Sequence, residues 1–146
     1  MSFWHLYYHL LLATRERMPL IPAHLEPELH RHLVIHALQF GATVHAVNGV
    51  EDHIHLVTSI PSWVNITDFV GCLKESSTLV LNQRHNGRGS FAWQNGYGIL
   101  SIGPSNLERT IKYVRWQKEH HAEGTVVEAL ELIVGELDHA AIAAIG

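Results

Sequence analysis

The chain of 146 residues has one cysteine, no excess of positive charge and no long uninterrupted apolar segment. The single cysteine, Cys72, excludes a disulfide framework and a zinc site built on cysteine thiolates, and a reducing, cytoplasmic setting suits it best. The apolar N-terminal stretch is interrupted by His5, His9 and two tyrosines, and no small-residue cleavage site follows it. We therefore expect neither a signal peptide nor a membrane span. With 47% hydrophobic residues, the composition is that of one globular domain over residues 1–146.

The net charge of −4 argues mildly against nucleic-acid binding, but the distribution of charge argues for it. Residues 74–118 hold seven of the ten basic residues and only two acids, whereas the chain from Glu119 onward has six acids and no Lys or Arg. A local basic zone can contact phosphates even in an acidic chain, although a solvated helix face is the alternative. The candidate nucleic-acid contacts are Lys74, Arg84, Arg88, Arg109, Lys112 and Arg115.

Hydrophobic periodicity predicts an α+β chain in the order β-α-β-β-α-β, followed by one or two C-terminal helices. This is the order of the ferredoxin-like split βαβ fold, in which an antiparallel sheet carries helices on one face and has its first and third strands at the centre. A further C-terminal helix would carry a tyrosine. The strands are expected at residues 3–13, 42–47, 53–60 and 99–102, and the helices at 23–40, at 66–84 and from residue 105 onward.

Local signals predict how these elements begin and end. Asn48-Gly49 is a strong turn signal, although the connection to the next strand looks longer than a minimal hairpin. Ser105, with Glu108 three residues later, predicts a capping box at the start of the third helix. Gly124 is a plausible stop, and residues 124–146 would form a helical tail of the same domain.

His53 and His55 project from one face of the third predicted strand, while Ile54 and Leu56 project from the other. The apolar face can pack under helices, which leaves the histidine face for a site. Alternate histidines are a common way to hold a divalent ion, but an isolated pair is more often not a metal site. Asp52, just ahead, could hydrogen-bond to an imidazole.

Tyr113 and Gln117 are four residues apart in a helical pattern and so share a face, together with Arg109. A tyrosine among cations can attract phosphate and act as an oxygen nucleophile in phosphoryl transfer. The amide oxygen of Gln117 suits Mg²⁺ or Mn²⁺. The most common role of a helical tyrosine is a half-buried packing residue, but this one falls off the apolar stripe predicted for Leu107, Ile111 and Val114.

Three segments in combination resemble the single-tyrosine HUH transposases of small bacterial insertion sequences, the IS200-like transposases, and the related repeat-associated tyrosine transposases. They are residues 52–57 (DHIHLV), 91–98 (FAWQNGYG) and 113–121 (YVRWQKEHH). The likeness runs from about residue 4 to residue 121. His120-His121 matches the family pattern without an assigned role, and Trp93 and Tyr97 could either stack on bases or pack in the core.

The resemblance implies the ferredoxin-like fold and a Mg²⁺- or Mn²⁺-dependent enzyme that nicks and rejoins single-stranded DNA at hairpin-bearing element ends. Tyr113 would be the nucleophile that forms a 5′-phosphotyrosine, and the metal ligands would be His53, His55 and Gln117. Such proteins usually work as homodimers, in which the tyrosine helix can serve the partner's histidines.

Two other readings stay open. One is a binding module, descended from a transposase, that holds structured nucleic acid without chemistry. The other is a metallohydrolase that uses water on a phosphodiester and forms no protein–DNA adduct. The acidic segment after Glu123 departs from the basic residues expected in many relatives, which puts DNA contacts there in doubt.

Overall fold

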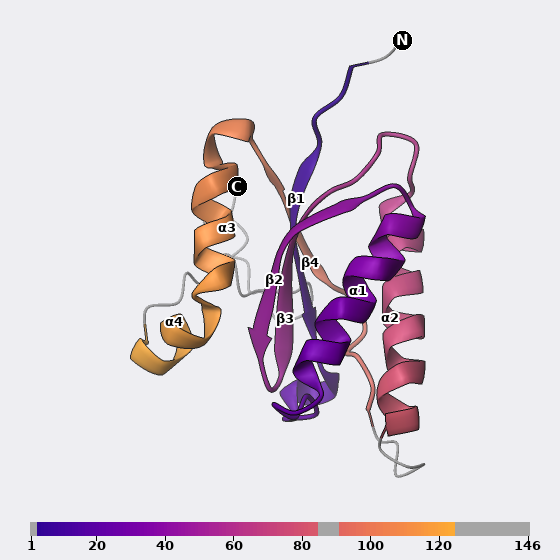
Figure 1. The fold of residues 1–146 in the computed structure, drawn as a ribbon, viewed down its shortest axis with the longest axis vertical. Helices are drawn as coiled ribbons and strands as arrows, with labels where there is room; N and C mark the ends of the chain where they lie inside the picture. Colours follow the sequence, from indigo (N-terminus) through magenta and orange to yellow (C-terminus); the bar gives the residue numbers. More distant parts are fainter. Residues whose placement is uncertain (1–2, 85–90, 125–146) are drawn as a thin grey trace.

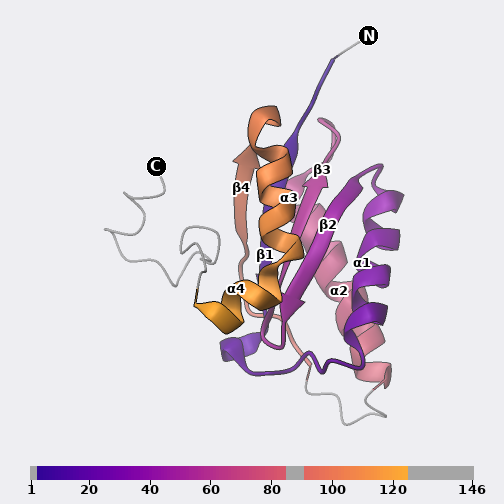
Figure 2. The same cartoon turned by 60° about the vertical axis from the view of Figure 1, so that its left-hand side comes forward.

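A four-stranded antiparallel sheet lies between two layers of helices (Figure 1). The computed structural model describes residues 3–84 and 91–124. Helices α1 and α2 cover one face of the sheet, and α3 and α4 cover the other; Figure 2 shows α3 lying over the strands. The elements are β1 (Tyr7–Ala13), α1 (Glu26–Gln39), β2 (Thr43–Val50), β3 (His53–Ser59), α2 (Ile66–Arg84), β4 (Gly98–Ile102), α3 (Leu107–Arg115) and α4 (Gln117–Glu123), with short 3₁₀ turns at Arg15–Arg17 and Pro104–Asn106.

The strand order β2-β3-β1-β4 confirms the predicted ferredoxin-like sheet, with the first and third strands at its centre. Two helices cover one face as predicted, and the helix that carries the tyrosine covers the other. Strand β3 pairs with β1 on one side and with β2 on the other. Its first six residues are buried because both of its faces are covered.

The main core lies between the sheet and the α1/α2 layer. Ile54 and Leu56 of β3 face this core, as their alternation with the histidines predicts. The two helices supply apolar side chains at four-residue intervals, which places them on one helix face. These are Leu29, Leu33 and Ala37 from α1, and Phe69, Leu73 and Leu81 from α2.

A second, smaller cluster lies on the opposite face of the sheet. Tyr113 and Val114 of α3 pack there with Val57 of β3 and Ile102 of β4, and Ile111 packs against them. The prediction that Tyr113 lies off the apolar stripe of its helix was therefore wrong: the ring belongs to the same cluster as Val114 and is only 8% exposed.

The predicted continuous helix through Tyr113 and Gln117 is broken at Trp116. Its backbone leaves the helical region (φ −100°, ψ 22°), so α3 ends at Arg115 and α4 starts at Gln117 in a new direction (Figure 2). A side chain from the sheet is inserted at this point, since the Asn48 amide donates a hydrogen bond to the Arg115 carbonyl at 2.9 Å. Insertion of such a group into the helical ladder is a recognised cause of a kink.

The turn predicted at Asn48-Gly49 was also wrong. Both residues lie inside β2, where Asn48 pairs with His55, and the two strands are joined at Glu51-Asp52. Pairing with β3 outweighs the local turn preference here. Asn48 uses its side chain instead to hold the junction of α3 and α4.

The capping box predicted at Ser105 does not form. Ser105 lies in the 3₁₀ turn, and Asn106, at the N-cap of α3, already has helical φ/ψ and no side-chain capping bond. A capping side chain needs an extended backbone at that position. Gly124 does end α4, with φ of 70°. The predicted helix in the tail and the loop after Arg84 fall outside the described residues. No helix in the described ranges is long and apolar enough to cross a membrane.

Lys118 ties α4 to the rest of the molecule. Its ammonium forms an ion pair with Glu26 at the start of α1 and donates to Asn48 Oδ1 at 2.8 Å and to the Gly49 carbonyl at 2.7 Å. One side chain thus joins three elements that lie far apart in the sequence.

Replacing Lys118 by methionine is expected to lower the free energy of unfolding by about 1–2 kcal/mol, because the aliphatic stem stays but three polar partners are lost. The ion pair itself contributes little, since the Lys118 side chain is 46% exposed. Urea denaturation would measure the change, with Lys112→Met, at an exposed position of α3, as the control. Equal stability of the two variants would contradict the role given to Lys118.

Candidate active site

The two histidines of β3 lie on the sheet face beneath α3 and α4, as the alternation of the strand predicts. Both are buried, with 1% exposure for His53 and none for His55. Their ring centres are 5.1 Å apart and their planes are nearly perpendicular. Two imidazoles bound to one ion at about 2.1 Å would have a similar separation of their centres, roughly 4.5–5 Å.

The carboxylate of Asp52 fixes the tautomer of His53. Nδ1 of His53 lies 2.6 Å from Asp52 Oδ1, and because a carboxylate accepts, Nδ1 must carry the proton. This hydrogen bond is the main reason why the pKa of Asp52 lies below its usual value. In the neutral imidazole this leaves Nε2 of His53 with a lone pair for the site.

A third histidine, His9 of β1, faces Nδ1 of His55 in the same way. Nε2 of His9 lies 2.7 Å from His55 Nδ1, in rings that are almost parallel (7°) and almost fully buried. In the antiparallel register Leu11 is opposite His55, so His9 is a diagonal neighbour on the same face. When His55 Nδ1 is the donor, its Nε2 is left as a lone-pair donor to an ion, as in His53.

The amide of Gln117 and the imidazole of His121 meet Nε2 of His53. Gln117 Nε2 lies 3.4 Å and His121 Nε2 3.1 Å from that nitrogen. A half-turn of the fully buried Gln117 amide would exchange its nitrogen for its oxygen. Neighbouring ligands of one Mg²⁺ or Mn²⁺ ion are separated by about 3 Å when each bond is about 2.1 Å.

A divalent ion at this place would need the amide oxygen of Gln117 among its ligands. Within the described ranges no three His, Cys, Asp or Glu side chains are arranged to hold a metal ion. The set predicted from the sequence, His53, His55 and Gln117, offers two imidazole nitrogens and one amide oxygen, donor types that Mg²⁺ or Mn²⁺ accepts, and His121 lies at its edge.

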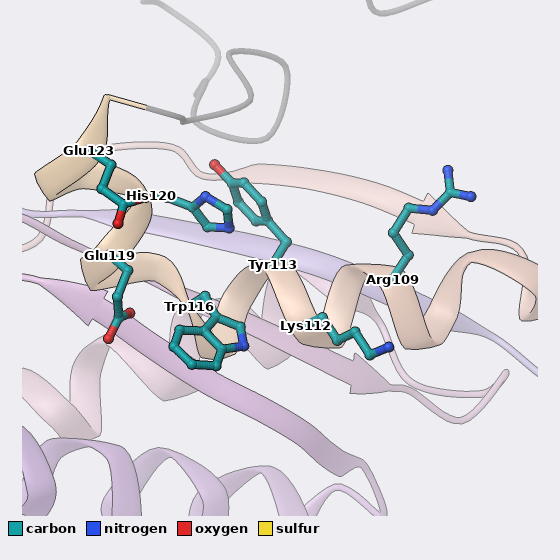
Figure 3. Close-up of a pocket in the computed structure, with 7 residues that line it drawn as sticks. All are labelled: Arg109, Lys112, Tyr113, Trp116, Glu119, His120 and Glu123. Atoms are coloured by element: carbon teal, nitrogen blue, oxygen red, sulfur yellow. The ribbon is translucent and has the colours of Figure 1, made fainter.

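Tyr113 lies beside the second histidine of the pair. Its ring meets that of His55 edge to face at 6.0 Å and stacks on the ring of His120 at 4.6 Å. Tyr113 and His120 also line a pocket along α3 and α4, which Figure 3 shows with the phenol oxygen directed away from the helix axis. The structure thus brings the candidate nucleophile and the candidate ligands together within one chain, across the kink.

Gly49 allows β2 to approach β3 closely at the site. A Cβ atom on Gly49 would lie 2.2 Å from the carbonyl oxygen of His53 and 2.8 Å from the Cα of Ile54. Both are backbone atoms that cannot move aside cheaply. The position of His53 therefore depends on a residue without a side chain on the neighbouring strand.

The five candidate nucleic-acid contacts that lie in the described ranges do not form one surface. Arg109 and Lys112 line the pocket of Tyr113, and Arg115 is exposed beside the kink. Lys74 donates to the carbonyls of Gln94 and Gly96, and burial lowers its pKa. Arg84 pairs with Glu28 at 2.8 Å on the α1/α2 side of the sheet, and Arg88 lies outside the described residues.

Four residues of the site had no role assigned from the sequence: His9, Trp116, His120 and His121. His9 could have been found from the pattern, because it alternates with Leu11 on a strand predicted to lie beside the histidine pair. Of the two aromatics considered for base stacking, Trp93 is buried and donates to Ser77 Oγ at 2.9 Å, so it packs in the core. Trp116 is 59% exposed in the Tyr113 pocket.

Comparison with known proteins agrees with this fold. A transposase candidate from Deinococcus radiodurans R1 is 25% identical, with a TM-score of 0.64 over 80% of this chain and 93% of its own. A REP-associated tyrosine transposase bound to a REP hairpin shares the fold at 12% identity, with a TM-score of 0.61 over 86% of this chain and 74% of its own. No curated protein sequence matches. The model of the family described as "Transposase IS200 like" matches residues 2–117, and the chain therefore belongs to the IS200-like transposase family.

Proposed function

We propose that this protein nicks and rejoins single-stranded DNA at the ends of an insertion element, with Tyr113 as the nucleophile and a Mg²⁺ or Mn²⁺ ion held by His53, His55 and Gln117. Membership of the family supports a role in DNA transposition in general. The observation that carries the finer proposal is that the Tyr113 ring contacts His55 while Gln117 contacts His53, all within one chain.

The covalent step exchanges one phosphate ester for another. The Tyr113 oxygen bonds to the scissile phosphorus, and the bond from phosphorus to the 3′ oxygen breaks. The strand end on one side becomes a 5′-phosphotyrosine, and the 3′ oxygen takes up a proton in place of the one that the phenol loses. Because the ester bond is conserved, the free 3′-hydroxyl of another end can attack the phosphotyrosine and rejoin the DNA.

The hydrogen bonds behind the two imidazoles support a metal site. Asp52 and His9 each face an Nδ1 atom, so that both Nε2 atoms can act as ligands. A bound divalent ion would polarise the scissile phosphate and stabilise the charge that develops on it. The chain itself supplies the orientation of these donors and, through the burial of His53, His55 and Gln117, the exclusion of water.

We propose single-stranded DNA that carries a hairpin as the partner. A solved structure of the same fold is bound to a REP hairpin, and Arg109 and Lys112 can contact phosphates next to Tyr113. The homodimer and the cytoplasmic setting expected from the sequence belong to this proposal. Since Tyr113 lies beside His55 of its own chain, the dimer would not be needed to complete the site in this arrangement.

Replacing Tyr113 by phenylalanine is expected to abolish the covalent protein–DNA adduct and leave DNA binding largely unchanged, because only the nucleophilic oxygen is removed. A denaturing gel would detect the adduct after incubation with Mn²⁺ and labelled single-stranded DNA from the two flanks of the protein's own gene. Tyr97→Phe, which removes a hydroxyl 3.3 Å from Thr67 Oγ1, is the matched control and should keep the adduct. Cleavage without any adduct in the wild type would indicate attack by water instead.

Removing either a ligand of the ion or the ion itself should stop the chemistry. His53→Ala and Gln117→Ala are each expected to weaken Mn²⁺ binding at least tenfold in a titration followed by electron paramagnetic resonance, since each loses one of three donors. His24→Ala, at an exposed position outside the site, should bind like the wild type. Full adduct formation in excess EDTA would refute the metal site and leave the role of Tyr113 standing.

His9→Ala is expected to weaken Mn²⁺ binding by roughly 10- to 100-fold, the usual effect of losing a group that orients a metal-binding histidine. His9→Gln can still accept from His55 Nδ1 and should restore part of the affinity. Imidazole ¹⁵N shifts of the metal-free variants would show whether the protonated nitrogen of His55 changes. Unchanged shifts and unchanged affinity in His9→Ala would disprove the orienting role.

A further inference from the structure

The pocket beside Tyr113 contains an exposed aromatic side chain, Trp116, that the proposed chemistry does not use. It is a hollow of about 460 Å³, within the range of ordinary ligand pockets, along the outer side of α3 and α4. Figure 3 shows its lining: Tyr113 and His120 lie on one side and Trp116 and Lys112 on the other. Trp116, at the kink, is the large aromatic side chain of this lining that solvent reaches.

The backbone of Trp116 is held by two hydrogen bonds. Its amide donates to the Lys112 carbonyl at 3.1 Å, and its carbonyl accepts from the His120 amide at 2.9 Å. The backbone at the kink is therefore held from both helices while the ring stays 59% exposed. An accessible aromatic plane is what a nucleobase needs for stacking, and stacking tolerates any base sequence.

Charge divides the pocket into two ends. The α3 end carries Arg109 and Lys112, and the α4 end carries Glu119 and Glu123 (Figure 3). A DNA backbone that starts at Tyr113 is attracted toward the first end and repelled from the second. The charges therefore favour one orientation of a bound DNA strand along the pocket.

We propose that this pocket holds the first nucleotides of the DNA strand that is joined to Tyr113, with a base stacked on Trp116 and the following phosphates beside Lys112 and Arg109. The inference rests on the proposed function, because it takes Tyr113 as the point where the strand begins. The carboxylates of Glu119 and Glu123 keep the strand from running along α4. The site binds by stacking and charge, so it selects single-stranded over paired DNA and not one base over another.

Binding to a 5′-phosphorylated, fluorescently labelled oligothymidylate of eight nucleotides tests the proposal without any covalent step. All proteins would carry Tyr113→Phe, and fluorescence anisotropy would give the dissociation constants. Adding Trp116→Ala is expected to weaken binding roughly 5- to 150-fold, the equivalent of about 1–3 kcal/mol for one stacked base. Trp116→Tyr should keep most of the affinity. Trp63→Ala, at a position 73% exposed and outside the pocket, should change nothing.

An abasic first nucleotide makes the test specific to stacking. Removing that base should weaken binding to the Trp116 protein and have no further effect on the Trp116→Ala protein, because both changes delete the same contact. Lys112→Ala should reduce the salt dependence of binding by about one phosphate contact, whereas Glu119→Gln should not weaken binding. Melting curves would confirm that each variant is folded.

Three outcomes would overturn the inference: no measurable binding of the oligonucleotide to the Tyr113→Phe protein, equal effects of Trp116→Ala and Trp63→Ala, or an unchanged penalty for the abasic nucleotide in Trp116→Ala. A change in oligomeric state in Trp116→Ala, without a change in the effect of the abasic nucleotide, would make the ring a contact between subunits. Because the binding assay uses no cleavage, the two tests are separate: absence of a covalent adduct in the wild type would refute the proposed chemistry, whereas the binding results decide whether the pocket holds a single strand.

Discussion

The burial of β3 on both faces is the constraint on which the site depends. A strand between two neighbours, covered by helices above and below, sends alternate side chains into two different environments. Ile54 and Leu56 enter the main core, and His53 and His55 enter the space under α3 and α4. A slip of one residue in its pairing would bury both imidazoles among leucines and expose the core residues to the opposite layer. The hydrophobic core therefore fixes the register that the histidines need.

Because of the kink between α3 and α4, each of the two helices contacts a different histidine of β3. Tyr113 in α3 lies over His55, and Gln117 in α4 lies at His53. The kink is held from the sheet, because Asn48 binds the last carbonyl of α3 and also accepts from Lys118 of α4. Asn48 pairs with His55 across the sheet, so the residue that shapes the helices is a direct neighbour of the residue that they cover.

The sequence was informative where the spacing of residues along a single strand or helix determines the structure. Alternation along β3 was enough to place His53 and His55 on one face, and the order of elements was enough for the fold. The pair Tyr113 and Gln117 was found through a helical spacing, although the helix is broken between them. Their common location comes from a tertiary contact of Asn48 that no local pattern contains.

Contacts between distant segments explain the remaining differences. Asn48-Gly49 has the composition of a turn, but pairing with β3 extends the strand to Val50. Charge counting placed Lys74 and Arg84 among the nucleic-acid contacts, whereas their side chains bind loop carbonyls and Glu28. A count of basic residues cannot reveal which of them already have partners. His9 was overlooked because its role is defined only when β1 and β3 are paired.

The close approach at Gly49 has a genetic consequence. A single base change at the first or second position of a glycine codon replaces glycine with a bulkier amino acid or, in one case, creates a stop codon. At Gly49 any such exchange would place a Cβ atom against the backbone of His53 and Ile54, so that this backbone would have to shift. One exchange on the strand beside His53 can thus disturb the site in a copy of this gene. The tyrosine and the histidine pair would still be present in the sequence of that copy.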